Sequence, residues 1–128
     1  SIETVQNKEH YLKQDGQTVF KAAVKAMADN TVEIMRRNNL ETKDVAWLVP
    51  HQANMRIITA TAERMGLPRE QVMINIHKYG NTNAATIPMC LSEWNTDGKI
   101  KKGDNIIMSS FGAGYTFGSV LLRWNMNK

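Results

Sequence analysis

A continuous apolar run, Val45-Ala46-Trp47-Leu48-Val49, constrains the possible folds of this chain more than any other segment. Its length is typical of a β-strand, and Pro50 stops it because proline cannot continue a ladder of strand hydrogen bonds. The run lacks the alternation of a strand with one face in water, which indicates a strand buried on both faces, as in a parallel sheet. The chain is therefore predicted to be an α/β protein.

The rest of the chain is predicted to supply helices and further strands around this one. Helices follow from apolar residues at helical spacing, and strands from short apolar runs between turn residues. The expected elements are strand 9–14 at a sheet edge, helix 18–38, strand 45–49, helix 52–65, strand 72–76, helix 84–96, strand 105–108 and strand 115–124. A turn is expected at Asp15-Gly16, and the last two strands should pair antiparallel. Together they predict a layered α/β domain with a mixed sheet and a C-terminal antiparallel hairpin.

Size and charge limit the kinds of protein this chain can be. Its 128 residues suffice for about one domain, so 1–128 is taken as a single domain. No apolar run is long enough to span a membrane, and the first residues lack the basic and apolar regions of an export signal. A single cysteine, Cys90, excludes an internal disulfide and suits a reducing compartment, so a cytoplasmic protein is expected. The net charge of +4 favours an acidic partner, but no nucleic-acid-binding motif accompanies it.

Two polar side chains, His51 and Asn81, stand where apolar segments break into helices. Ligands of α/β folds bind at the carboxyl ends of strands, and an imidazole N–H there can hold a developing oxyanion. A capping or packing histidine is the alternative for His51. Asn81, in Gly80-Asn81-Thr82, is equally well explained as a turn or cap residue. Thr82 is an equally good cap, which would leave the Asn81 amide free.

Several further residues bear on the chemistry. The small residues of Phe111-Gly112-Ala113-Gly114 would let backbone N–H groups face a substrate, but a tight hairpin requires them too. Cys90 lies within the helix expected at 84–96, where a buried structural thiol is the better interpretation. The histidines lack zinc-ligand spacing and no second cysteine exists, so no metal site is expected. Arg56 lies about one helical turn after His51, where a cation could receive a phosphate or an acidic carrier.

Three motifs in order resemble a known family. They are Trp47-Leu48-Val49-Pro50-His51-Gln52-Ala53-Asn54, Tyr79-Gly80-Asn81-Thr82-Asn83-Ala84-Ala85 and Phe111-Gly112-Ala113-Gly114-Tyr115-Thr116-Phe117-Gly118-Ser119. They are similar to the C-terminal half of β-ketoacyl-acyl-carrier-protein synthase III, the condensing enzyme that starts bacterial type II fatty-acid synthesis. The resemblance covers about residues 11–124. It implies the C-terminal half of a thiolase-like fold and a Cys-His-Asn triad.

The resemblance implies a role for each matching residue. His51 and Asn81 match the triad histidine and asparagine, and the nucleophilic cysteine is expected in an N-terminal half that this chain lacks. Cys90 does not match that cysteine. Ala113 would supply a backbone N–H to an oxyanion where the family more often has glycine. The remaining matches are substrate or pantetheine positions (Gly16, Phe20, Ala53, Asn54 and Phe111) and carrier-docking cations (Arg56, with Lys21 and Arg64 in support).

The implied reaction is a decarboxylative Claisen condensation of an acyl-CoA, typically acetyl-CoA, with malonyl-acyl carrier protein. No cofactor is expected, because both substrates are thioesters. The implied partners are acyl carrier protein, acyl-CoA, the N-terminal half of the same enzyme and a second copy in a homodimer. Three alternatives stay open: a polyketide-type condensing domain, a non-catalytic carrier-binding or dimerisation domain, and an enzyme that uses Cys90 with His51 and Asn81.

Overall fold

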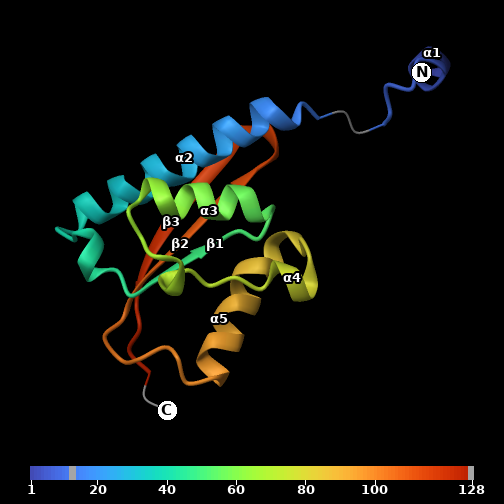
Figure 1. The fold of residues 1–128 in the computed structure, drawn as a ribbon. Coiled ribbons are helices and arrows are strands. Elements are labelled where there is room, and N and C mark those ends of the chain that lie inside the picture. Colours follow the sequence, from blue (N-terminus) through green and yellow to red (C-terminus); the bar gives the residue numbers. More distant parts are fainter. Residues whose placement is uncertain (12–13, 127–128) are drawn as a thin grey trace.

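A three-stranded mixed sheet with helices on both faces organises the chain (Figure 1). The computed structural model describes residues 1–11 and 14–126. Its helices and strands are α1 (Ile2–Gln6), α2 (Gly16–Arg37), β1 (Trp47–Pro50), α3 (Met55–Arg64), α4 (Ile76–Tyr79), α5 (Thr86–Thr96), β2 (Asn105–Gly112) and β3 (Thr116–Arg123). The strand order is β1-β2-β3, with β1 parallel to β2 and β2 antiparallel to β3. The predicted α/β class, mixed sheet and C-terminal hairpin are confirmed.

Strand β1 is buried on both of its faces, as the unbroken apolar run predicts. Leu48 packs with Ile107 of β2 in a core cluster that also contains Ile58 of α3. Its neighbour Val49 belongs to a second cluster, on the side of α5, together with Cys90. Figure 1 shows α2 and α3 on one side of the sheet and α5 on the other. The helices thus cover both faces of β1.

Side-chain caps determine where the main helices begin. Asp15 accepts hydrogen bonds from the backbone N–H groups of Gln17 and Thr18 at 3.0 and 3.2 Å, so α2 begins at Gly16 and not after a separate turn at Asp15-Gly16. Asn54 accepts from the N–H of Arg56 at 2.8 Å, which delays α3 until Met55. These caps satisfy N–H groups that the first turn of a helix leaves without partners. Residues 52–54, expected as helix, therefore form the loop between β1 and α3.

Two predicted strands are wrong. At the expected edge strand 9–14, residues 9–11 form a turn and a bend and Gln14 is irregular, while residues 12 and 13 lie outside the described part. Segment 72–76 makes one isolated parallel bridge, between Val72 and Leu48, and Ile76 already begins α4. The buried side chain of Gln52 accepts the backbone N–H groups of Asn75 and Ile76, which takes the place of a strand ladder.

The C-terminal hairpin is longer than expected, since β2 continues to Gly112. The 3-10 turn Ala113–Tyr115 then joins it to β3. Gly114 has a φ of 73° and Tyr115 one of 55°, so this turn uses left-handed backbone at two successive positions. None of the helices in the described residues combines the length and the hydrophobicity that a bilayer crossing requires.

Candidate active site

A cavity of about 940 Å³ lies at the carboxyl end of β1. Residues from α2, from the loop and first turn of α3, from the loop before α5 and from the β2–β3 hairpin line it. Nine of the eleven site residues predicted from the sequence are among them: Gly16, Phe20, His51, Ala53, Asn54, Arg56, Asn81, Phe111 and Ala113. The other two, Lys21 and Arg64, are not. The fold therefore brings residues from four separate segments to one place.

His51 is held from two directions just beyond β1. Its backbone N–H donates to the carbonyl of Ser109 at 2.8 Å, which extends the β1–β2 pairing by one residue. Its ring is half-buried, and Nδ1 lies 2.7 Å from the hydroxyl of Thr86 at the start of α5. Burial lowers the pKa of His51 below the usual histidine value, because it disfavours the charged ring. The imidazole is therefore neutral near neutral pH.

Asn81 is oriented by the turn in which it lies. Its side-chain oxygen accepts the backbone N–H of Asn83 at 3.0 Å. Asn83 has a φ of 52°, a left-handed conformation that asparagine tolerates better than most residues. Thr82, the other cap considered, does stand at the N-cap position of the 3-10 turn Asn83–Ala85, but its side chain makes no cap hydrogen bond and its hydroxyl donates to the sulfur of Met89 at 3.6 Å. Within the described residues no hydrogen bond is recorded for the Asn81 amide nitrogen, so its two N–H groups are available to a ligand in the cavity.

The side chain of Gln52 anchors the loop that carries His51 to neighbouring backbone. This side chain is fully buried and makes four hydrogen bonds to backbone. Its nitrogen donates to the carbonyls of Pro50 and Met73 at 2.7 and 3.1 Å. Its oxygen accepts the N–H groups of Asn75 and Ile76 at 3.1 and 3.2 Å. One side chain thus ties the end of β1 to the segment that leads toward Asn81.

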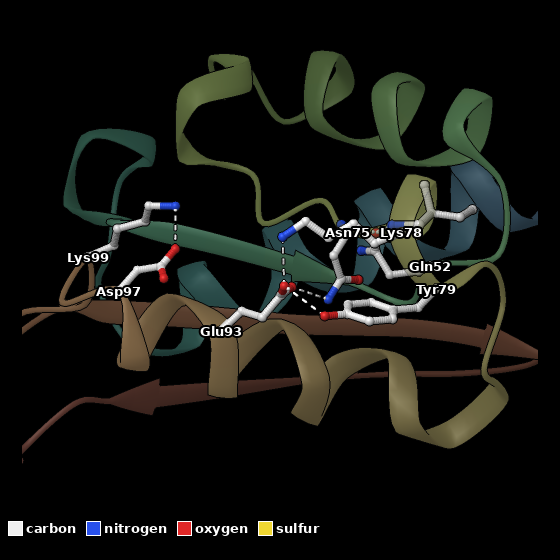
Figure 2. A network of polar contacts seen from close by, with 8 residues as sticks. Gln52, Asn75, Lys78, Tyr79, Glu93, Asp97 and Lys99 are labelled. Atoms are coloured by element: carbon white, nitrogen blue, oxygen red, sulfur yellow. Dashed lines mark hydrogen bonds and ion pairs between the residues drawn. The ribbon is translucent and has the colours of Figure 1, made fainter.

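The carboxylate of Glu93 on α5 adds a second set of hydrogen bonds to the same region (Figure 2). It accepts hydrogen bonds from Asn75 Nδ2 at 2.8 Å, from Lys78 Nζ at 2.8 Å and from the Tyr79 hydroxyl at 3.1 Å. The bond from Lys78 is the largest cause of a lowered Glu93 pKa, and the same contact raises the pKa of Lys78. The network joins α4 to α5 and so limits the freedom of the loop that carries Asn81.

The opposite wall comes from the end of β2. The ring of Phe111 stands edge-on to that of Tyr115, with centroids 5.7 Å apart and planes at 89°. Both line the cavity together with the exposed turn at Ala113. This turn is the part of the hairpin that can approach a bound group most closely, because Gly112, Ala113 and Gly114 carry little or no side chain.

The three predicted docking cations have different surroundings. Arg56 is exposed, lines the cavity and lies over the ring of Phe20 at 5.2 Å from its centroid. Arg64 pairs with Asp29 at 2.9 Å, a carboxylate that Lys25 also contacts. Lys21 is exposed on α2 beside Phe20 in sequence, outside the cavity lining. Only Arg56 joins the cavity to the charged surface.

Cys90 is unsuited to nucleophilic chemistry. It is fully buried, and its thiol is 3.9 Å from the carbonyl of Met73. Burial raises its pKa to about 12, so the thiolate is scarce at neutral pH. In the part of the chain that the structure describes, no three His, Cys, Asp or Glu side chains lie close enough together to hold a metal ion.

A model of one protein family matches residues 35–124 of the chain, which include the loop of His51, the turn of Asn81 and the hairpin. Its description is "3-Oxoacyl-[acyl-carrier-protein (ACP)] synthase III C terminal". The chain belongs to this family. The name is a synonym of the β-ketoacyl synthase III that the sequence motifs resemble.

Curated relatives agree with this membership in the synthase III family. The chain is 60% identical to "Beta-ketoacyl-[acyl-carrier-protein] synthase III" of Chlorobaculum tepidum over 124 residues, which are 97% of this chain and 38% of that protein. It is 59% identical to the protein of the same name from Porphyromonas gingivalis over 122 residues, 95% of this chain and 36% of that one. The chain therefore spans little more than a third of the length of these relatives.

Solved structures of synthase III share the fold. That of the Pseudomonas aeruginosa protein superimposes with a TM-score of 0.86 at 43% identity, over 91% of this chain and 37% of that one. The protein from Aquifex aeolicus gives a TM-score of 0.86 at 45% identity, over 89% and 37% of the two chains. The chain thus has the fold of one part of a synthase III enzyme.

Sequence reasoning missed several residues that hold this synthase III site together. Gln52 and Asn75 are polar side chains within apolar stretches, and that is the signal by which buried, hydrogen-bonded residues can be found. Thr86 follows two alanines at the start of a helix, where a hydroxyl is common and gives no signal of its contact with His51. That contact joins residues far apart in the sequence, which local patterns do not reveal.

Proposed function

We propose that this chain is the enolate-holding and carrier-docking part of a β-ketoacyl-acyl-carrier-protein synthase III. The observation that supports this most is the meeting of His51, Asn81 and the Ala113 turn in one cavity with Arg56 at its exposed edge. A half-buried imidazole and a free amide are suitable partners for a developing oxyanion. The high identity to synthase III proteins makes their reaction the natural one to assign.

The proposed reaction forms a carbon–carbon bond between two thioesters. An acyl group from acyl-CoA is first carried on a cysteine in the other half of the enzyme. Malonyl-carrier thioester then loses carbon dioxide, and the electron pair of the broken bond becomes an enolate. His51 and Asn81 hold the enolate oxygen while its carbon attacks the acyl-cysteine and the cysteine thiolate leaves. In comparable oxyanion sites, removal of one such donor raises the activation free energy by about 3–4 kcal/mol.

The remaining cavity residues would hold the pantetheine arm and the acyl-cysteine oxyanion. Gly16, Phe20, Ala53 and Asn54 line the cavity between α2 and the start of α3, which suits an extended arm of moderate polarity. The backbone N–H of Ala113 would receive the oxyanion that forms when the enolate attacks, and Phe111 would wall off that side. A backbone donor is unaffected by alanine in place of glycine.

The proposed role of Arg56 is to bind the acidic carrier protein, which accounts for part of the positive net charge. An acyl carrier protein is acidic and delivers its pantetheine arm into the cavity, so a cation at the cavity edge would orient it. Lys21 adds charge nearby on α2, and Arg64 contributes less because of its ion pair with Asp29.

Two further partners belong to the proposal. Strand β3 exposes large apolar side chains, with Phe117 and Val120 each 56% accessible. Such a surface suits burial against the N-terminal half of the enzyme or against a second copy in a homodimer. We place the reaction in the cytoplasm, where a chain with one free, buried thiol is stable.

The experiment that tests the proposed function joins this chain to its nucleophile-bearing half. In that enzyme, Asn81→Ala should lower kcat for condensation of acetyl-CoA with malonyl-carrier by roughly 10²–10³. Asn125→Ala, at an exposed position after β3, is the matched control and should leave kcat unchanged. Full activity of the Asn81→Ala enzyme would contradict the assignment. A non-catalytic carrier-binding domain predicts no condensation by either enzyme.

A polyketide-type enzyme and an enzyme complete within this chain have less support. The polyketide type shares the triad, but the relatives that match most of this chain at 59–60% identity are named as synthase III. An enzyme complete within this chain would need Cys90, and its burial and raised pKa oppose that role. Incubation of the isolated chain with acyl-CoA should therefore leave Cys90 unlabelled.

A further inference from the structure

A cation and an aromatic ring meet at the exposed edge of the cavity. The guanidinium carbon of Arg56 lies over the ring of Phe20, 5.2 Å from its centroid, and both side chains line the cavity. Arg56 is the second residue of α3, and Phe20 lies near the start of α2. Each of these helices begins at a side-chain cap, Asn54 for α3 and Asp15 for α2. The contact therefore joins two helix ends whose positions are already fixed.

Packing holds the ring of Phe20 in place. The ring lies against a buried core cluster that joins α2 to α3 and consists of Ala23, Met27 and Ile57. Phe20 is half-buried, whereas Arg56 is exposed to solvent. The face of an aromatic ring carries partial negative charge and attracts a cation. Because the ring is anchored and the arginine is not, the ring is the partner that can orient the other.

The guanidinium of Arg56 has no acidic partner in the described part of the chain. The ring of Phe20 is its one recorded side-chain contact there, and no ion pair or side-chain hydrogen bond is recorded for it. Arg36, by comparison, donates two hydrogen bonds to Glu33, both at 2.9 Å. A ring is not an anion, so it can orient a guanidinium and still leave the positive charge to an acidic ligand.

The place of Arg56 in α3 does not serve the stability of that helix. The first N–H groups of a helix lack partners within the helix and carry partial positive charge, so a cation in the first turn is disfavoured. The same partial charge adds to the attraction that Arg56 exerts on an anion. An exposed arginine at this position therefore suits the binding of an acidic partner better than it suits folding.

We propose that Phe20 is a positioning residue for carrier docking, whose ring holds Arg56 at the cavity edge in the orientation that meets the acidic carrier protein. The inference rests on the proposed function, because it takes Arg56 as the docking cation. It gives Phe20 a second role besides lining the cavity for the pantetheine arm. The effect of losing the ring should be smaller than that of losing the arginine, since the charge itself remains.

Binding of apo-carrier protein, which has no pantetheine arm, separates the two roles of Phe20. The protein tested is this chain joined to its nucleophile-bearing half, and titration calorimetry measures the dissociation constant. Phe20→Leu should weaken the binding of apo-carrier about threefold, the size expected for an exposed cation–π contact. Phe20→Tyr retains an aromatic ring and should restore the affinity. In an Arg56→Gln protein, which has no cation to orient, Phe20→Leu should cause no further loss.

The outcomes distinguish this inference from the proposed function. Equal losses from Phe20→Leu with and without Arg56 would overturn the inference, because the ring would then not act through that cation. A loss confined to holo-carrier would also overturn it and leave Phe20 with the arm alone. Unchanged binding of carrier by Arg56→Gln would instead refute the docking cation of the proposed function, and the inference with it. If Phe20→Leu fails to fold, Phe20→Met is a second variant without a ring, with a flexible side chain that can fill the gap.

Discussion

The two sides of the cavity are built in contrasting ways. On the side of β1 and α5, His51, Gln52 and Thr86 are fastened by hydrogen bonds to backbone and to one another, in largely buried surroundings. On the side of α2 and the outer face of α3, Arg56 and Lys21 are exposed cations with few constraints. The residues proposed to meet a reacting atom are held by satisfied polar contacts, whereas those proposed to attract a partner only need to present charge.

This contrast has an energetic basis. A buried polar group that loses its partner costs about 1–3 kcal/mol, because water cannot replace the lost bond. An exposed ion pair contributes about 0–1 kcal/mol, since solvent screens it. Changes on the buried side should therefore alter stability, and changes on the exposed side should alter partner binding. Substitutions at four positions test that division, in order of decreasing effect.

Gln52→Met should have the largest effect on stability. The substitution keeps the length of the side chain but removes all four hydrogen bonds that Gln52 makes to backbone carbonyl and N–H groups. We expect a loss of about 3 kcal/mol in the free energy of unfolding, measured by chemical denaturation. Gln71→Met, at a half-buried position with no recorded side-chain hydrogen bond, should change little. Equal losses of unfolding free energy in the two variants would contradict the special role of the buried side.

Arg56→Glu should weaken binding of acyl carrier protein about tenfold, equal to about 1.4 kcal/mol, with unfolding free energy nearly unchanged. Arg64→Glu is the matched variant on the same helix, and it should weaken binding less because Arg64 lies outside the cavity lining and is ion-paired with Asp29. Titration calorimetry at two salt concentrations would measure both, with the larger salt dependence lost in Arg56→Glu. A greater effect at Arg64 would reverse the assignment of the docking residue.

Asn54→Ala should cost about 1 kcal/mol of stability, because Asn54 caps α3 at the boundary between the two sides. Asn54→Asp retains an oxygen that can accept the Arg56 N–H and should retain most of the stability. Thermal and chemical denaturation of both variants would measure the difference. A stability loss in Asn54→Asp as large as that in Asn54→Ala would contradict the capping role of the side-chain oxygen.

The ionisation of His51 should give the smallest effect. Its folded pKa lies below the unfolded value of about 6.5. The unfolded chain then binds more protons between the two pKa values, so stability is lost as pH falls through that interval and regained as pH rises. Unfolding free energies measured at stepwise pH should show this slope in the wild type and lack it in His51→Gln. His77→Gln, at an exposed position, should retain it.

The sequence allowed most of the fold to be predicted where burial produces a pattern. The unbroken run before Pro50 indicated a strand buried on two faces, and β1 is one. The apolar segment 72–76 carries the same local signal but lies beside only one strand, where Gln52 satisfies part of its backbone. A run of five residues does not reveal whether a second strand lies next to it, so the same signal led to a wrong prediction.

Residue types and the order of the motifs allowed the residues of the candidate site to be predicted, but not the contacts that orient them. His51, Asn81 and the hairpin were identified, and the fold gathers them into one cavity. The contacts that orient them, through Thr86 and Glu93, join segments distant in the sequence. Local preferences ranked Thr82 as highly as Asn81 for the turn, because both have a side-chain oxygen. In the folded chain Thr82 holds the N-cap position, but the side-chain oxygen that accepts a backbone N–H there is that of Asn81.

The pairing of β1 with β2 determines when this site can exist. Trp47 and Ile106 are partners in a parallel ladder, and nearly half of the chain lies between them. Such distant pairings form slowly, because the ends of a long loop must find each other. The backbone of His51 bonds to Ser109, and the facing wall follows at Phe111. During synthesis from the N-terminus, helices α2 and α3 can form early, but the cavity must wait for β2 to leave the ribosome.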